Sequence, residues 1–64
     1  MAIGKNIALY RKLNNSTQAE LSKAVGISRG YLVAIERGRK IPGIKVVARI
    51  ANHFDLRLED LLKE

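Results

Sequence analysis

The chain has 64 residues, a length that allows one domain with a compact core. Its 47% apolar and 28% charged residues are typical of a globular protein rather than a disordered one. The absence of cysteine excludes disulfides and thiolate metal sites. The sequence contains neither a signal segment nor the ~18-residue apolar run that spans a bilayer. We therefore predict one cytoplasmic domain, residues 1–64, without a membrane partner.

The net charge of +6 is unevenly distributed. Residues 1–54 contain ten Lys and Arg against two Glu, a net charge of +8, whereas residues 55–64 contain two basic and four acidic residues, a net charge of −2. A basic body with a mildly acidic end indicates a polyanionic partner for the body. The alternative is that these charges serve only solubility.

The predicted elements are helices, because no alternating apolar run lies between turn residues. The first helix covers about residues 3–13 and places Ile3, Ile7 and Tyr10 on one face. The Asn-Asn pair at 14–15 ends it, since asparagine adopts left-handed backbone angles at little cost.

The second helix has the clearest start in the chain. Thr17 and Glu20 are spaced as a capping box, in which a hydroxyl and a carboxylate satisfy free backbone N–H groups reciprocally. The helix covers about residues 18–25 and ends at Gly26, which can adopt the left-handed angles of a sharp turn.

The third predicted helix covers about residues 29–37, with Ser28 as its N-cap and its end near Gly38. At ~100° per residue, Leu32 and Ile35 share the face that can enter a core. The opposite face carries mostly small and apolar residues: Gly30, Val33, Ala34 and Arg37. An outer face of this composition raises the question of what covers it.

After Pro42 and Gly43 the chain enters a fourth helix, and a short fifth helix covers about residues 58–62. The fourth helix has an apolar stripe made of Ile44, Val47, Ile50, Ala51 and Phe54. Helices this short cannot form a long bundle, so they must cross at steep angles around one core. The predicted fold is all-α and compact, with five helices.

Residues 18–37, QAELSKAVGISRGYLVAIER, have the spacing of a helix-turn-helix. The pattern needs apolar residues at five fixed positions, a small residue where the second helix crosses, and a glycine in the turn. The seven residues that meet it are Leu21, Val25, Ile27, Leu32, Ile35, Ser22 and Gly26. A plain helical hairpin is the alternative, but hairpins do not generally require this spacing.

The chain resembles the lambda-repressor/Cro-like, or Xre-type, helix-turn-helix family over nearly its whole length. The resemblance rests on IGKNIALYRK, STQAELSKAVGIS, IERG, the Pro-Gly-Ile before the fourth helix, and FDLRLEDLL. It implies a five-helix, sequence-specific double-stranded DNA-binding domain that acts as a small transcriptional repressor on operator DNA, usually as a homodimer. It also implies a bacterial or phage-type host and an association with the nucleoid.

In this family the third helix is the recognition helix and lies in the major groove. The resemblance therefore implies that Arg29 can fork onto guanine, that Gly30 permits close approach, and that Val33 and Ala34 can touch thymine methyl groups. Arg37 can reach a base or a phosphate. Few of these side chains donate hydrogen bonds, so specificity would also rest on DNA shape. Alternatively, Val33 and Ala34 pack on a neighbouring segment or on a second protein.

Phosphate contacts are expected outside the recognition face. The start of the second helix suits an anion, since free N–H groups and the helix dipole favour negative charge there. The implied phosphate contacts are Thr17, Gln18, Ser28, Tyr31, Arg39, Lys40 and Lys45. The alternative for the loop residues among them is that they form a basic loop that is only solvated and binds no phosphate.

The family also pairs an arginine of its first helix with a glutamate near the end of the third. Arg11 and Glu36 stand at these positions, so we expect a structural ion pair that fixes the recognition helix. Two departures concern packing. Ser16 replaces a commonly apolar residue, and Leu13 is expected to fold inward over that gap, with a partner surface at Leu9 and Leu13 as the alternative.

The remaining expectations concern partners and chemistry. Arg57 replaces the Ser or Thr that often caps the fifth helix, which predicts a weak start. Dimer contacts are expected at Leu56, Leu58 and Leu61, although some of these must fill the core. A protein partner is the alternative function, in which the same fold serves as an antitoxin or adaptor module. His53 has no surrounding catalytic arrangement, so we predict no enzyme, no cofactor and no metal.

Overall fold

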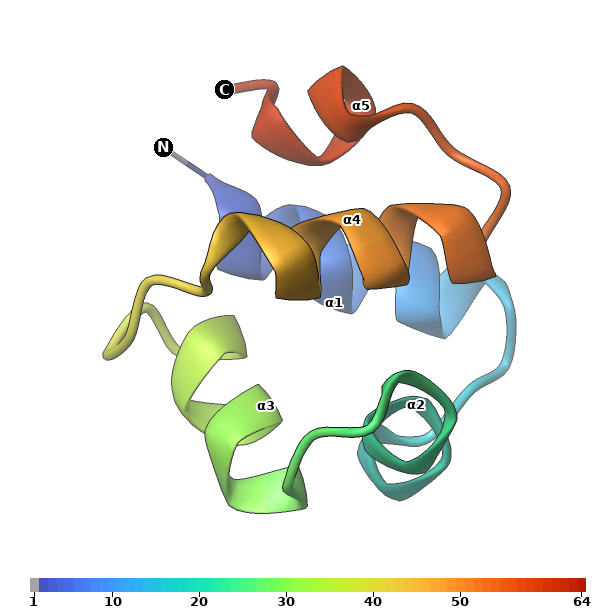
Figure 1. Ribbon diagram of the computed structural model, residues 1–64, viewed down its shortest axis with the longest axis vertical. Coiled ribbons are helices and arrows are strands. Elements are labelled where there is room, and N and C mark those ends of the chain that lie inside the picture. The colour runs from blue at the N-terminus through green and yellow to red at the C-terminus, as the bar shows by residue number, and fades with distance from the viewer. Residues whose placement is uncertain (1) are drawn as a thin grey trace.

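The computed structural model describes residues 2–64. Its elements are helices α1 (Ile3–Leu13), α2 (Gln18–Val25), α3 (Arg29–Glu36), α4 (Ile44–His53) and α5 (Leu58–Leu62), with no strand in this range (Figure 1). The all-α prediction is confirmed, and the helix limits agree with the predicted ones except that α3 ends one residue earlier.

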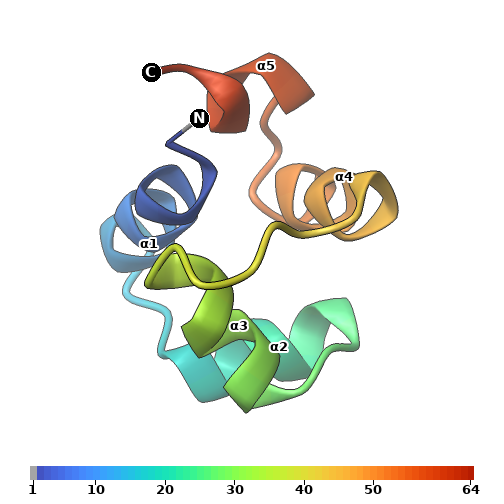
Figure 2. The same cartoon turned by 90° about the vertical axis from the view of Figure 1, so that its left-hand side faces the viewer.

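The helices form three levels. Helices α1 and α4 occupy the middle, α5 covers them on one side, and α2 and α3 lie on the other (Figures 1 and 2). Both ends of the described chain lie on the α5 side. The face formed by α2 and α3 is therefore the part of the molecule most distant from α5.

Every helix contributes to one apolar core. Its fully or nearly buried residues are Ile3, Ile7, Leu21, Val25, Leu32, Ile35, Val47, Ile50, Ala51 and Leu61. Tyr10, Ile27 and Phe54 pack against this core and are half-buried. Ile44 belongs to the predicted apolar stripe but not to the core: it is 65% exposed, because the first turn of α4 extends beyond the core.

The predicted helix ends follow from local hydrogen bonds. Thr17 Oγ1 accepts the N–H of Glu20 at 3.0 Å, and Glu20 Oε1 accepts the N–H of Thr17 at 2.8 Å, which confirms the capping box. The hydrogen bond from the backbone N–H of Thr17 to its carboxylate holds the pKa of Glu20 below its ordinary value. Asn15 and Gly26 have φ values of 54° and 75°, the left-handed angles predicted for the two chain reversals.

The two ends of α5 are held differently. At its start Arg57 provides no side-chain cap, and only the carboxylate of Asp60 accepts the N–H of Arg57, at 3.0 Å. At its end Asn6 of α1 donates from Nδ2 to the carbonyl oxygens of Leu61 and Lys63, at 2.9 and 2.6 Å. Because Arg57 has no hydroxyl to cap the helix, the start of α5 agrees with the predicted weak start. The hydrogen bonds from Asn6 fix the end of α5 on α1.

The gap at Ser16 is closed by a polar contact rather than by Leu13. Leu13 is 67% exposed, so the prediction that it folds inward is wrong. Arg11 Nη1 instead donates to the carbonyl oxygen of Ser16 at 2.9 Å. A buried guanidinium contributes to the packing that an apolar residue would otherwise supply.

Candidate nucleic-acid interface

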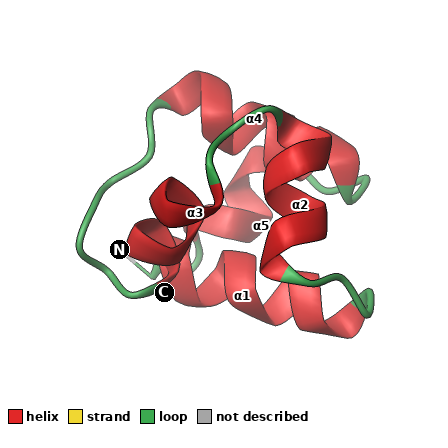
Figure 3. Cartoon of the chain, turned by 90° about the horizontal axis from the view of Figure 1, so that it is seen from below, coloured by secondary structure: helices red, strands yellow, loops and turns green. Residues whose placement is uncertain are grey.

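Helices α2 and α3 are joined by the tight turn that the helix-turn-helix spacing predicts. The backbone N–H groups of Gly26 and Ile27 both donate to the carbonyl oxygen of Ser22. Ser22 is buried, and its hydroxyl donates to the carbonyl oxygen of Ala19 at 3.0 Å. A small side chain at this position lets α3 cross close to α2 (Figure 3).

The start of α3 is capped as predicted. Ser28 Oγ accepts the backbone N–H of Tyr31 at 3.0 Å. The hydroxyl hydrogen of Ser28 remains able to donate to a phosphate oxygen, because the cap uses the oxygen only as an acceptor.

The outer face of α3 is accessible where the helix begins. Arg29 and Gly30 are exposed, and no atom lies within 4 Å of the position that a Cβ on Gly30 would occupy. Arg37, the C-cap at the other end of α3, is also exposed. Val33 and Ala34 are half-buried, partly because the following loop folds back on the helix end. The N–H groups of Arg39 and Lys40 both donate to the carbonyl oxygen of Ala34, at 2.8 and 3.3 Å.

The loop between α3 and α4 presents basic side chains beside this helix. Arg39, Lys40 and Lys45 are exposed, and none of them forms an ion pair within residues 2–64. The Lys40 ammonium lies 5.9 Å from the ring centroid of Tyr31, within cation–π range. Pro42 is buried and ties the loop to the body of the protein.

The N-terminus of α4 continues the same surface. Its N-cap is Gly43, which offers no side-chain hydrogen bond. The backbone N–H groups of Ile44 and Lys45 have no acceptor within the described residues. Free N–H groups at a helix N-terminus are suited to an anion.

Arg11 and Glu36 form the predicted ion pair. Arg11 donates from Nε to Glu36 Oε2 at 2.7 Å and from Nη2 to Glu36 Oε1 at 3.0 Å. The two side chains are only 11% and 6% exposed. Burial acts to raise the pKa of Glu36, but the hydrogen bonds from Arg11 and Gln18 outweigh it and hold this pKa below its ordinary value. The same pair raises the pKa of Arg11.

Gln18 joins this ion pair, which the sequence did not predict. Its Nε2 donates to Glu36 Oε1 at 3.0 Å, so one carboxylate connects α1, α2 and α3. Gln18 keeps a second amide hydrogen for another acceptor. Thr17 and Gln18 therefore hold the start of α2 in place while remaining at its surface.

Other sequence-predicted residues lie away from this surface. Leu61 is fully buried and fills the core, so it offers no contact to a second copy, whereas Leu56 and Leu58 are half-buried. His53 is exposed, and its ring meets that of Phe54 edge to face at 4.9 Å. Within residues 2–64, no three His, Asp or Glu side chains are grouped to hold a metal ion, and no helix is long and apolar enough to cross a membrane.

Comparison with known proteins identifies the family. The sequence model that describes the helix-turn-helix family matches residues 7–61 of this chain. The chain belongs to the Xre-type, lambda-repressor-like helix-turn-helix family. The match covers α2, the turn, α3, α4 and most of α1 and α5, which confirms the resemblance noted from the sequence.

Two relatives within this helix-turn-helix family are named as a regulator and a repressor. An uncharacterized HTH-type transcriptional regulator of Methanocaldococcus jannaschii is 42% identical over 52 residues, which are 81% of this chain and 79% of that protein. The immunity repressor protein of Bacillus phage phi105 is 30% identical over 64 residues, the whole of this chain but only 44% of the repressor.

A solved structure of the family includes DNA. The crystal structure of SinR, the master regulator for biofilm formation, in complex with DNA superimposes with a TM-score of 0.89 and 31% identity, and covers 95% of this chain and 98% of that one. The fold and family of this helix-turn-helix chain are therefore those of DNA-binding transcriptional regulators rather than of enzymes.

Proposed function

We propose that this chain binds operator DNA sequence-specifically as a homodimer, with α3 in the major groove, and represses transcription in the cytoplasm at the nucleoid. One observation carries the proposal. The inner face of α3 is fully buried through Leu32 and Ile35, while Arg29 and Gly30 on its first turn are open to solvent and a basic loop lies beside the helix. The SinR–DNA complex and the phage repressor support the same function.

Base readout is assigned to the outer face of α3. Arg29, at the first turn, can donate two hydrogen bonds to a guanine, a contact worth roughly 1–3 kcal/mol of discrimination. Gly30 leaves space for the DNA to approach the backbone. Val33 and Ala34 suit thymine methyl groups, and Arg37 extends from the helix end toward a base or a phosphate.

Phosphate binding is assigned to both sides of α3. Thr17, Gln18 and Ser28 hold helix starts and keep hydrogens that can be donated. On the other side, the basic loop and the uncapped start of α4 supply charge and backbone N–H groups. The phosphate contacts proposed here are Thr17, Gln18, Ser28, Tyr31, Arg39, Lys40 and Lys45.

A homodimer would place two copies of α3 on one operator. The half-buried Leu56, which precedes α5, and Leu58, its first residue, are the proposed contacts between copies, without Leu61. Dimers with a closed twofold axis are the commonest form of soluble homo-oligomer. It would also match a palindromic operator with half-sites one helical turn apart.

The test begins with a duplex selected by the wild-type protein from a random-sequence library. Fluorescence anisotropy then compares this duplex with a scrambled one at ~50 and ~200 mM salt, where several phosphate contacts predict a weakening of ~10³–10⁵-fold. Arg29→Ala should remove the preference for the selected duplex. Lys40→Ala should weaken binding to both duplexes alike, and Lys12→Ala, which removes an exposed charge from α1, is the matched control.

Two results would count against the proposal. Equal binding to both duplexes by the wild type would contradict sequence-specific readout. Absence of binding at low salt would contradict DNA binding altogether and favour the antitoxin or adaptor role, in which the partner is a protein.

A further inference from the structure

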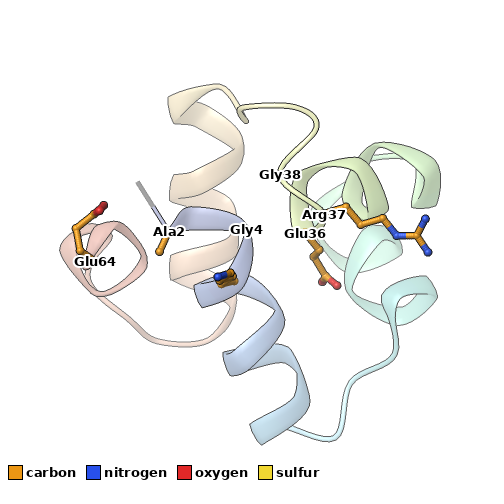
Figure 4. A pocket seen from close by; sticks show the side chains of 7 residues that line it. Ala2, Gly4, Glu36, Arg37, Gly38 and Glu64 are labelled. Carbon is orange, nitrogen blue, oxygen red and sulfur yellow. The ribbon is translucent and has the colours of Figure 1, made fainter.

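One glycine of α1 lies where no side chain fits. A Cβ built on Gly4 would overlap the carbonyl oxygen of Ile35 and lie 3.2 Å from the Cα of Glu36, both backbone atoms at the end of α3. At the other four glycines of the chain, nothing lies within 4 Å of such a Cβ. Figure 4 shows Gly4, Glu36 and Gly38 around the hollow where the start of α1 meets the end of α3.

The backbone conformation does not explain this glycine. Gly4 is the second residue of a regular helix, and positive φ values occur at Gly26 and Gly38 instead. Glycine is a poorer helix former than alanine, so α1 carries an unfavourable residue at this position. The close approach of two backbones is what the position requires.

The atoms that Gly4 meets belong to the recognition helix. The carbonyl oxygen of Ile35 is in the last turn of α3 and already accepts the N–H of Gly38, at 3.0 Å. It is therefore part of the rigid hydrogen-bonded end of the helix and cannot rotate away from an added side chain. The overlap with an added Cβ could be relieved only if α3 moved relative to α1.

Gly4 and Arg11 contact the same end of α3. They are seven residues apart on α1, about two turns or ~10.5 Å along its axis, and share one face of it. Gly4 meets the backbone at residues 35–36, and Arg11 holds the Glu36 carboxylate. At the other end of α3, Arg29 and Gly30 are exposed.

We propose that Gly4 is a positioning residue for sequence readout: its missing side chain sets how closely α3 approaches α1, and thereby where the base-reading side chains stand relative to the phosphate-binding groups. This inference rests on the proposed function of α3. Hydrogen bonds to base edges tolerate displacements of only about 0.5 Å. Phosphate contacts through flexible lysine and arginine side chains tolerate more. A side chain at position 4 should therefore reduce discrimination between sequences more than it reduces binding to DNA in general.

The experiment compares Gly4→Ala with Ile7→Val, a variant that removes one methylene from the core under the same helix without adding volume. Both are tested in an Arg57→Ser background, which supplies the missing cap of α5 and should raise the stability of both variants. Folding is checked by circular dichroism. The dissociation constants for the wild-type-selected duplex and a scrambled duplex are then measured by anisotropy below the melting temperature of each variant.

For Gly4→Ala we expect the ratio of the two dissociation constants to fall at least about tenfold, the size of one lost base contact, with scrambled binding nearly unchanged. Ile7→Val should keep the wild-type ratio. A folded Gly4→Ala protein with the wild-type ratio would overturn the inference while leaving the proposed function intact. If Gly4→Ala does not fold even in the stabilised background, Gly4 acts in stability alone and the inference is likewise overturned. If the wild type selects no sequence, the proposed readout fails and the inference fails with it.

Discussion

The side-chain amide of Gln18 donates at 3.0 Å to the same Glu36 carboxylate that receives both hydrogen bonds from Arg11. One buried carboxylate thereby joins the start of α2, the end of α3 and the last turn of α1. Gln18 is also a proposed phosphate contact, so this link connects a group on the proposed DNA-binding surface directly to α3.

Removal of this carboxylate should be strongly destabilising. Glu36→Ala leaves the Arg11 guanidinium buried without a counter-ion, with only its hydrogen bond to the Ser16 carbonyl oxygen, and loss of one partner of a buried ion pair costs ~3–5 kcal/mol. A chain of 64 residues has a total stability of roughly 3–10 kcal/mol, so the variant should be marginally folded or unfolded at 25 °C. Urea denaturation measures the difference.

Glu59→Ala is the control, because Glu59 is an exposed glutamate on α5. Its effect should stay within ~0.5 kcal/mol. If Glu36→Ala also cost less than that, the network would not stabilise the fold.

Stability should decline in acid. The pKa values of Glu36, Glu20 and Asp60 are all lower in the folded state than their ordinary values of 4.5, 4.5 and 3.8. The unfolded chain therefore binds protons first, so the stability contributed by these groups is present above their ordinary pKa values and is lost as the pH falls through the folded ones. Urea midpoints should be level near neutral pH and fall below about pH 4.5.

Glu36→Gln isolates one of these groups. It removes the charge while keeping the size of the side chain, so it should lower stability at neutral pH and reduce the acid dependence. Glu59→Gln provides the comparison for a simple change in net charge. Identical pH profiles for Glu36→Gln and the wild type would show that Glu36 does not contribute to the acid transition.

The helix limits could be predicted because each rests on a local signal. The Thr17–Glu20 box, the Ser28 cap and the positive φ at Asn15 and Gly26 involve residues within a few positions of one another. The apolar spacing likewise predicted most of the core. Ile44 was the exception, because helical periodicity does not reveal where a helix extends beyond its neighbours.

The contacts between helices could not be read in the same way. The bond from Gln18 to Glu36 spans 18 positions, and that from Asn6 to Leu61 spans 55, so both depend on how the helices cross. The role of Gly4 is visible only once α3 is placed against α1. Arg11 and Glu36 were paired from the sequence only through the family resemblance.

Completing the cap of α5 should stabilise the protein. Arg57 has the extended backbone of an N-cap but offers no acceptor to the free N–H groups, while Asp60 already supplies the reciprocal half of a capping box. Arg57→Ser should therefore add ~0.5–2 kcal/mol, measured by thermal or urea denaturation. Arg57→Ala is the control, because it removes the same charge without adding a hydroxyl; equal stability of the two variants would argue against capping.

Two glycines near the start of α3 should respond in opposite directions to alanine. Gly30 is helical, exposed and surrounded by open space, so Gly30→Ala should stabilise the free protein by ~0.5–1 kcal/mol. Gly26 has a φ of 75°, which costs an L-residue roughly 1–2 kcal/mol, so Gly26→Ala should destabilise the free protein.

The extra methyl of Gly30→Ala also stands on the proposed DNA-facing side, so this more stable variant should bind the selected duplex more weakly. Denaturation and anisotropy on the same samples separate the two effects. Unchanged affinity in Gly30→Ala would mean that the DNA does not approach α3 at this residue.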